Sequence, residues 1–327
     1  KGRKRDFRGD PMKRIFELAF NDFFNMKKRE ILETIRHSEG RTVVAECVIS
    51  CPPLIYGVSN AELAASFGAD MITLNTFDFE KPFIFGIDDE GTSLSETENF
   101  IKNYFKKIEE NRVNADYIKK VKSITGRFIG VNLEPVPESV KNFPKGRRVS
   151  KENLEKARFY GFDYVVITAN PNTGVSSEDI VKSLELCREI LEEDMIIIAG
   201  KMHAAGRENV FDPQVVKGFA INGADVVLIP APGTVPGMDM DTAKRLIREI
   251  HSEGALAMTA IGTSQEGAGR ETIRDIALLS KMAGADIQHI GDAGFSGMAF
   301  PENIMELSIT IRGKRHTYRR MGYSSRK

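Results

Sequence analysis

The sequence contains no tryptophan, only three cysteines and no excess of charge of either sign. Its 327 residues include 46 Lys+Arg and 46 Asp+Glu, so the formal net charge is zero. A protein without an overall basic field has no general attraction for nucleic acid or an anionic membrane, and we expect neither as a partner. The cysteines are odd in number and show no paired CxxC spacing, which favours reduced thiols over a disulfide or zinc framework.

Long hydrophobic runs are also missing. Apolar runs such as Met195–Ala199 are far shorter than the roughly 18 residues that cross a bilayer, and Lys1–Pro11 is charged where a signal peptide would be apolar. The chain does contain 41% hydrophobic residues, among them 20 Phe, which is enough apolar material for a large core. We therefore expect a globular, cytoplasmic protein.

Eight short runs rich in β-branched or apolar residues alternate with helix-length segments, of which the amphipathic Ser177–Glu192 is an example. The expected strands are Thr42–Ile49, Met71–Thr76, Arg127–Glu134, Tyr164–Ala169, Met195–Met202, Val226–Ile229, Ala255–Ile261 and Ile287–Ile290.

A Gly-x-Asp triplet stands before each even-numbered run. The triplets end at Asp70, Asp163, Asp225 and Asp286, and the last two intervals are 225 − 163 = 62 and 286 − 225 = 61 residues. The longer first interval contains an insertion over 77–126. A repeated pair of strand–helix units predicts a closed TIM (β/α)8 barrel rather than an open doubly wound sheet.

We expect one domain over residues 1–327, with N-terminal helices over 1–40 and the insertion over 77–126 after the second strand. Asp10 and Pro11 are typical of a helix start, and Met12–Phe23 carries a stripe of large apolar side chains. This stripe must be buried, either against the barrel floor or against another subunit. The insertion is either a lid or an oligomerisation arm, and we expect a homo-oligomer.

The active site of a TIM barrel lies at the C-terminal ends of its strands. Strand alternation predicts that Asn132 and Glu134 face the lumen, and that Lys201 and His203 do so as well. We predict catalytic roles for Lys201, Glu134, His203 and Glu46 and substrate binding by Asn75, Asn132 and Asn170.

Lys201 has two expected uses. It either pairs with Glu134 or Glu46, or acts as a Schiff-base nucleophile or proton carrier. As an alternative, a divalent metal, Mg²⁺ or Mn²⁺, has candidate ligands in Glu46, Glu134, His203 and Asp292. The remaining interpretation is a polar network that only fills the barrel.

The segments after the seventh and eighth strands are rich in Gly, Ser and Thr and open onto helices, where TIM barrels commonly bind phosphate. The predicted phosphate-binding residues are Gly262, Thr263, Ser264, Gly267, Gly269, Arg270, Gly291 and Gly294. Glu266 and Asp292 would repel an anion unless they point away.

Three stretches carry a resemblance to a known family: Val58–Leu63, His289–Gly294 and Pro301–Tyr318. In them the sequence resembles a bacterial TIM-barrel family labelled haloacid dehalogenase-like hydrolase or phosphoenolpyruvate phosphonomutase-like protein. The resemblance implies the fold and provides no catalytic residues to carry over. A haloacid dehalogenase has a DxDx[TV] motif after an early strand, where this chain has Ala45–Ile49.

Together these patterns predict an enzyme that acts on a small phosphorylated or carboxylated metabolite, an anion, by lyase or isomerase chemistry of the aldolase or enolate type. A metal-assisted hydrolase is the first alternative. The second is a non-catalytic regulator that binds a metabolite.

Overall fold

The computed structural model describes residues 12–89, 105–109, 111, 113–168, 174–201, 211–292 and 296–323. Eight parallel strands pair in chain order and close on themselves, which confirms the predicted TIM (β/α)8 barrel. Every predicted strand is present, with its ends within two residues of those expected. The strands are β1 (Thr42–Val48), β2 (Met71–Asn75), β3 (Phe128–Leu133), β4 (Tyr164–Ile167), β5 (Ile196–Gly200), β6 (Val226–Pro230), β7 (Leu256–Ile261) and β8 (Ile287–Ile290).

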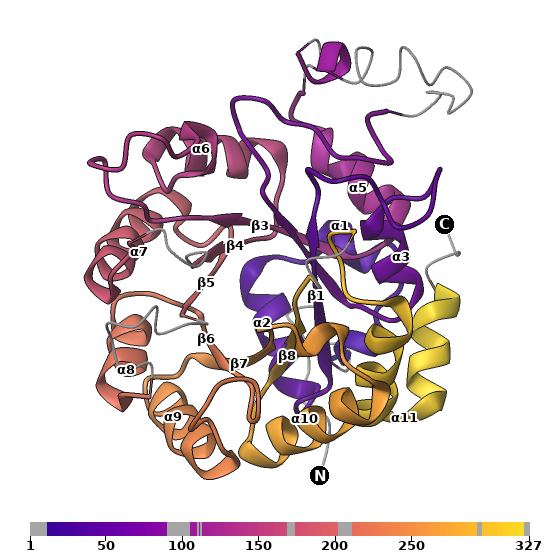
Figure 1. Ribbon diagram of the computed structural model, residues 1–327, viewed down its shortest axis with the longest axis vertical. Helices are drawn as coiled ribbons and strands as arrows, with labels where there is room; N and C mark the ends of the chain where they lie inside the picture. The colour runs from indigo at the N-terminus through magenta and orange to yellow at the C-terminus, as the bar shows by residue number, and fades with distance from the viewer. Residues whose placement is uncertain are drawn as a thin grey trace.

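A ring of helices surrounds the barrel (Figure 1). They are α3 (Asn60–Ser66), α5 (Tyr117–Thr125), α6 (Lys151–Tyr160), α7 (Ser177–Leu191), α8 (Pro213–Ile221), α9 (Met240–Ser252), α10 (Arg270–Ala283) and α11 (Pro301–Tyr323). None of the helices in the described residues combines the length and apolar character needed to cross a membrane. Cys47, Cys51 and Cys187 are free thiols.

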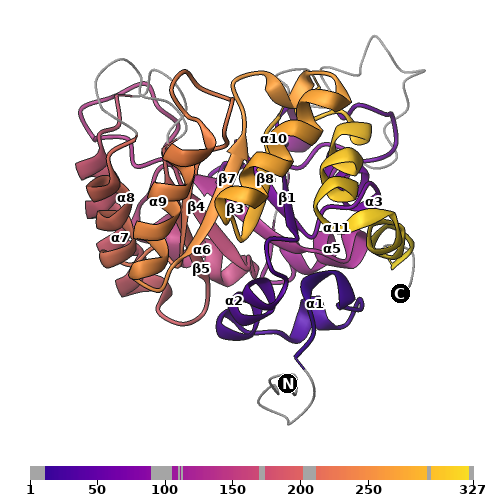
Figure 2. The same ribbon diagram turned by 90° about the horizontal axis from the view of Figure 1, so that it is seen from below.

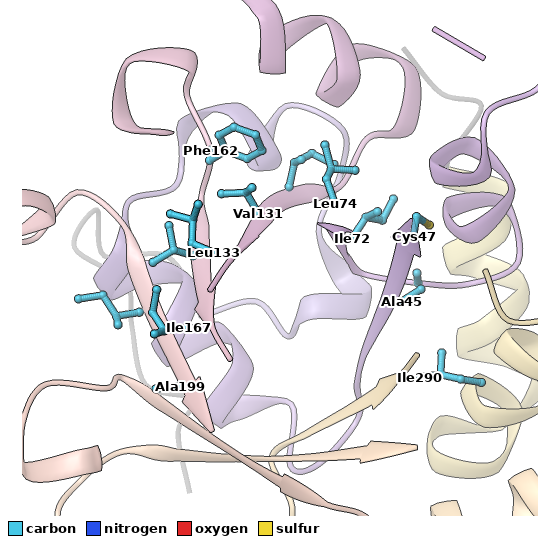
Figure 3. Close-up of a cluster of buried hydrophobic side chains, with 14 of the residues drawn as sticks. Ala45, Cys47, Ile72, Leu74, Val131, Leu133, Phe162, Ile167, Ala199 and Ile290 are labelled. Atoms are coloured by element: carbon cyan, nitrogen blue, oxygen red, sulfur yellow. The ribbon is translucent and has the colours of Figure 1, made fainter. Parts of the chain in front are cut away.

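Alternate side chains along each strand belong to two separate layers, as strand geometry requires. One layer packs between the strands and the helices, and Figure 3 shows its members Ala45, Leu74 and Val131. The other fills the lumen and includes Val44, Met71, Phe128, Tyr164, Ile198, Val226, Met258 and Ile287. This division settles which polar side chains on the strands can reach the barrel mouth.

The N-terminal segment closes the floor of the barrel (Figure 2). It contains η1 (Ile15–Glu17), α1 (Asp22–Asn25) and α2 (Lys28–His37), and its apolar side chains join the lumen layer. The expected burial against the floor is therefore confirmed. The expected continuous helix through Phe23 is wrong, because the backbone is extended at Leu18 between η1 and α1.

The Gly-x-Asp repeat has one structural role at all four positions. Each aspartate exchanges two hydrogen bonds with the preceding odd strand: its amide donates to a strand carbonyl, and its Oδ2 accepts from the amide of the same strand residue. The pairs are Asp70 with Val43, Asp163 with Ile129, Asp225 with Ile197 and Asp286 with Ala257. The repeat thus fastens each pair of strands at the N-terminal end of the barrel.

Each of these aspartates also contacts a basic side chain from the helical layer. The partners are Arg312 on α11, Lys122 on α5, Lys28 on α2 and His251 on α9. The contacts link the strand repeat to the helices and to the floor. They leave the opposite end of the barrel, where the strands terminate, for other chemistry.

The start of the expected insertion is part of the barrel wall. Phe77 and Phe79 are buried and pack against Phe162, while Phe79 stacks on Tyr160 of α6. Helix α5, which also falls within 77–126, belongs to the helical ring. The first residues of the insertion therefore do not form a free lid or arm.

Candidate active site at the barrel mouth

Four polar side chains from the adjacent strands β8, β1, β2 and β3 form a hydrogen-bonded row across the lumen. We call this row the mouth network, and its members are His289, Glu46, Asn75 and Asn132. His289 Nε2 lies 3.0 Å from Glu46 Oε2. Asn75 Nδ2 donates to Glu46 Oε1 at 2.5 Å, and Asn132 Nδ2 donates to Asn75 Oδ1 at 3.2 Å. The strand register explains the row, because β1 pairs with β8 on one side and with β2 on the other.

Two atoms of the mouth network are buried and have no hydrogen-bond partner among the described residues. They are Nδ1 of His289, a residue that is 6% exposed, and Oδ1 of Asn132, which is 5% exposed. An unsatisfied buried polar atom costs about 1–3 kcal/mol, so such atoms in a native fold call for an explanation. Two of them at the catalytic end of a barrel are consistent with groups that await a substrate.

His289 was not among the residues predicted from the sequence. It lies inside the apolar run Ile287–Ile290, whereas most of the predicted site residues lie at or just after the ends of the expected strands. The signal that could have revealed it is barrel closure. Once β8 pairs with β1, Val44 is the register partner of His289, and Glu46 lies two residues further along on the same face.

The loop after β7 brings a buried carboxyl to the same region. Thr263 and Ser264 both have left-handed φ values, of 58° and 77°, and lead into η4 (Gln265–Gly267). Asn303 Nδ2 donates to the carbonyls of Glu266 and Ala268, each at 2.9 Å, which fixes η4 to α11. Two consecutive non-glycine residues in this conformation are strained, and such strain is concentrated at functional sites.

The Glu266 side chain is enclosed, and the residue is 6% exposed. Its Oε2 has no hydrogen-bond partner among the described residues. Burial raises the pKa of the Glu266 carboxyl, and the negative charges of Asp292 and Glu46 raise it further, whereas a hydrogen bond from its own backbone amide and the charge of His289 lower it, with burial the largest effect. Glu266 is thus electrostatically linked to the mouth network.

These contacts oppose the predicted phosphate site. Arg270 pairs with Glu306 of α11 at 2.7 Å, so the expected guanidinium donor is bound elsewhere. The amides of Gly267 and Gly291 donate to backbone carbonyls, and Thr263 Oγ1 donates to the carbonyl of Thr234. Glu266 occupies the loop in which an anion was expected, and Gly294 lies outside the described residues.

The expected lumen orientation of Lys201 is wrong. Ile196 and Ile198 lie in the lumen layer and Ala199 lies in the outer layer, so alternation places Gly200, and not Lys201, on the lumen face. The error arose because β5 is apolar on both faces, so its sequence shows no alternation. Lys201 is half-buried directly after the strand, and its catalytic role stays a prediction. His203 and Asn170 lie outside the described residues.

Glu134 makes structural contacts with the loop that follows β3, and its expected pair with Lys201 stays a prediction. Its Oε1 accepts from Arg147 Nη2 at 2.7 Å, and its backbone exchanges hydrogen bonds with Arg147 and Val149. These contacts hold the end of the loop between β3 and α6 beside the barrel.

The candidate metal ligands do not assemble in the part of the chain that the structure describes, where no group of three or more His, Cys, Asp or Glu side chains is arranged to hold a metal ion. Glu46 is bound by Asn75 and His289, and Glu134 by Arg147. Asp292 is half-buried and acts on Glu266 through its charge. Because His203 lies outside the described residues, the predicted Mg²⁺ or Mn²⁺ site stays a prediction.

Solved structures similar to this chain are barrel enzymes of several kinds. An archaeal fructose 1,6-bisphosphate aldolase is 13% identical, with 89% of this chain and 98% of that chain covered and a TM-score of 0.49. 2,3-Dimethylmalate lyase, a PEP mutase/isocitrate lyase superfamily member, is 13% identical, with 81% of this chain and 80% of that chain covered and a TM-score of 0.47. Thiamine phosphate pyrophosphorylase from Pyrococcus furiosus is 11% identical, with 84% of this chain and 96% of that chain covered and a TM-score of 0.45. Similarity at this level carries no argument about the chemistry of this chain.

No curated protein matches the sequence. The haloacid dehalogenase label finds no support in these comparisons. The family model described as "Domain of unknown function (DUF7916)" matches residues 16–327, and the chain belongs to this family.

Proposed function

We propose that this protein is an enzyme that moves a proton at a carbon next to a carbonyl group in a small metabolite, as lyases and isomerases of the enolate type do. The observation that carries the proposal is His289, whose Nε2 is held by Glu46 while its Nδ1 is buried and unpartnered among the described residues.

The geometry suits a general base. A carboxylate that accepts the Nε2 proton fixes the imidazole in the tautomer whose Nδ1 lone pair is available to take a proton. After proton transfer, the Glu46 carboxylate stabilises the imidazolium that forms. Asn75 orients Glu46 in turn, through its bond to Oε1. A positioned base of this kind contributes about 10²–10⁴-fold to a rate.

The chain contains a second His–carboxylate pair that serves as a comparison. His251 Nε2 lies 2.7 Å from Asp286 Oδ2 at the N-terminal end of the barrel, within the Gly-x-Asp repeat. Its imidazole is 41% exposed, and the role of Asp286 in fastening the strands explains the pair without any substrate. Of the two pairs, the one at the mouth combines an imidazole held by a carboxylate with an enclosed nitrogen that has no partner among the described residues.

The charges at the mouth favour a carboxylated or uncharged carbonyl compound over a phosphate ester. Glu46, Glu266 and Asp292 interact electrostatically there, and a phosphate dianion would meet more repulsion than a single carboxylate. The hydrolase alternative depends on a metal-ligand group that the described residues do not form. The regulator alternative predicts ligand binding without proton exchange.

The test follows deuterium exchange into carbonyl probes in D2O by proton NMR, with pyruvate and 2-oxobutyrate as the favoured probes and dihydroxyacetone phosphate as the disfavoured phosphate ester. The native protein should catalyse deuterium incorporation next to the carbonyl. His289→Asn and Glu46→Gln should lower that rate by about 10²–10⁴-fold. His251→Asn is the matched control and should leave the rate unchanged, because its pair lies at the other end of the barrel.

A second measurement needs no substrate. Nitrogen-15 NMR of the labelled protein distinguishes the imidazole tautomers, and His289 should carry its proton on Nε2 and not on Nδ1. The opposite tautomer, or native exchange rates in His289→Asn, contradicts the proposal. Thermal melting of each variant confirms that the loss of exchange does not reflect unfolding.

A further inference from the structure

We propose that Glu266 is the second catalytic group of this site, a neutral carboxylic acid that protonates the carbonyl oxygen of the substrate while His289 removes the proton from the neighbouring carbon. This inference rests on the proposed function and adds to it the proton donor that the sequence did not indicate.

Position is the first support. Glu266 is not on a strand but on η4, which the loop after β7 carries to the barrel mouth. The two carbonyl bonds from Asn303 and the contact of Thr263 Oγ1 with the carbonyl of Thr234 anchor that loop to α11 and to the segment after β6. A rigid support is what a proton donor requires, because the donor must stay within reach of one substrate atom.

Burial without a basic partner is the second support. Oε2 of Glu266 is enclosed and has no hydrogen-bond partner among the described residues, and the carboxyl accepts a bond only from its own backbone amide. Among the described residues no basic side chain pairs with it, in contrast to the buried carboxylates of Asp70 and Asp163, which pair with Arg312 and Lys122. An ionised carboxylate left in this state is costly, and the neutral form is favoured. A neutral carboxyl in an enclosed site is a hydrogen-bond donor, as other enolising enzymes illustrate.

The surrounding charges act in the same direction. Asp292 in the segment after β8 and Glu46 on β1 disfavour a third negative charge, and burial raises the pKa of Glu266. His289 on β8 opposes them when it is protonated. The proposal places the transferable proton on Glu266 and the available lone pair on Nδ1 of His289, the nitrogen that Glu46 does not hold.

The proposed step balances in protons and electrons. The C–H bond of the substrate breaks and its proton goes to Nδ1 of His289. The electron pair forms the C=C bond, and the carbonyl oxygen takes the proton of Glu266, which becomes a carboxylate. The products are an enol, an imidazolium and a carboxylate. The reverse transfers return His289 and Glu266 to their starting protonation states.

This arrangement defines a substrate class. The substrate presents a carbonyl oxygen to Glu266 and an adjacent C–H bond to His289, as a 2-oxo acid, an aldehyde or a ketone does. The negative charge that develops on the substrate oxygen is neutralised by proton transfer from Glu266. This transfer gives a function to a carboxyl in the loop where an anion site was expected.

The first test measures the protonation state directly. Infrared difference spectra at neutral pH, native minus Glu266→Gln, should show the carbonyl stretch of a protonated carboxyl. Glu306→Gln, which removes a carboxylate paired with Arg270, is the control and should show no such band. Absence of the band in the native-minus-Glu266→Gln spectrum overturns the inference.

The second test separates this inference from the proposed function. In the pyruvate exchange assay, Glu266→Gln should reduce the rate at least tenfold and remove the decline of the rate at alkaline pH, because Gln keeps the shape but has no proton to transfer. If His289→Asn abolishes exchange while Glu266→Gln has the native rate and pH profile, the Glu266 role is refuted and the proposed function stands. If His289→Asn keeps the native rate, the proposed function fails, and the infrared result alone then decides whether Glu266 holds a proton.

Discussion

The ion pair between Asp70 and Arg312 provides the sharpest test of how the barrel is fastened. Both side chains are 0% exposed, and Asp70 Oδ2 accepts from Arg312 Nη1 at 2.5 Å and from the Val43 amide at 2.9 Å. The change Asp70→Asn preserves the shape and one acceptor oxygen. It leaves the Arg312 guanidinium buried without its carboxylate, close enough to Arg127 and Arg320 for the positive charges to repel one another.

The magnitude follows from burial. Removing one partner of a buried pair costs about 3–5 kcal/mol, whereas exposed pairs contribute about 0–1 kcal/mol. The matched variant is Asp286→Asn, at the same place in the repeat, whose partner His251 is 41% exposed. At an unfolding entropy of about 2.1 cal/mol/K per residue, a chain of 327 residues should lose about 4–7 °C in melting temperature with Asp70→Asn and below about 1.5 °C with Asp286→Asn.

Differential scanning calorimetry measures both variants beside the native protein. The double variant Asp70→Asn/Arg312→Met should regain part of the loss, because it removes the unpaired charge. Equal losses in the two single variants would refute the argument that burial sets the value of these contacts. A double variant less stable than Asp70→Asn would show that the bonds of Arg312 to Ser308 and Gly68 matter more than its charge.

Two further predictions follow from the floor and the mouth. Phe23→Ala should cost about 3–5 kcal/mol in urea unfolding, because Phe23 is buried against Phe128, whereas Phe159→Ala, at a side chain that is 60% exposed, should cost below about 0.5 kcal/mol. The folded-state pKa of Glu266 lies above its unfolded value, so the stabilisation it provides is present at acid pH and is lost as pH rises through the folded pKa. Urea titrations should therefore show native stability falling relative to Glu266→Gln as pH rises above 4.5, and a constant difference would contradict the shift.

The fold was predictable because its signals are local and repeated. Gly68, Gly161, Gly223 and Gly284 all have left-handed φ values, and each precedes by two residues an aspartate whose bonds to the neighbouring strand are the same. The repeat is visible in the sequence because each copy uses a glycine and an aspartate at the same spacing to connect to the next strand. The broken start of the N-terminal segment had no such signal, because packing against the lumen determined where η1 ended.

The site was predictable only where alternation is visible in the sequence. Glu46, Asn75 and Asn132 were expected in the lumen, and the structure brings them together. Lys201 follows a strand that is apolar on both faces, so nothing local fixes its orientation. His289 and Glu266 depend on barrel closure and on a loop held by α11, which are contacts between segments far apart in the chain.

The two ends of the barrel place similar side chains in different surroundings, and the difference lies in which of them pair with basic side chains. At the N-terminal end, buried carboxylates accept from strand amides and basic side chains, and this satisfaction is what stability requires. At the mouth, His289 Nδ1, Asn132 Oδ1 and Glu266 Oε2 are equally enclosed but have no partner among the described residues. Unpartnered buried atoms also occur at the N-terminal end, where Thr42 Oγ1 and Asp70 Oδ1 are examples, but the Asp70 carboxylate is ion-paired with Arg312. No such ion pair holds Glu266 among the described residues, and the free nitrogen of His289 belongs to a group that can take a proton. We therefore expect a substrate to satisfy the atoms at the mouth in the complex and to use them for proton transfer.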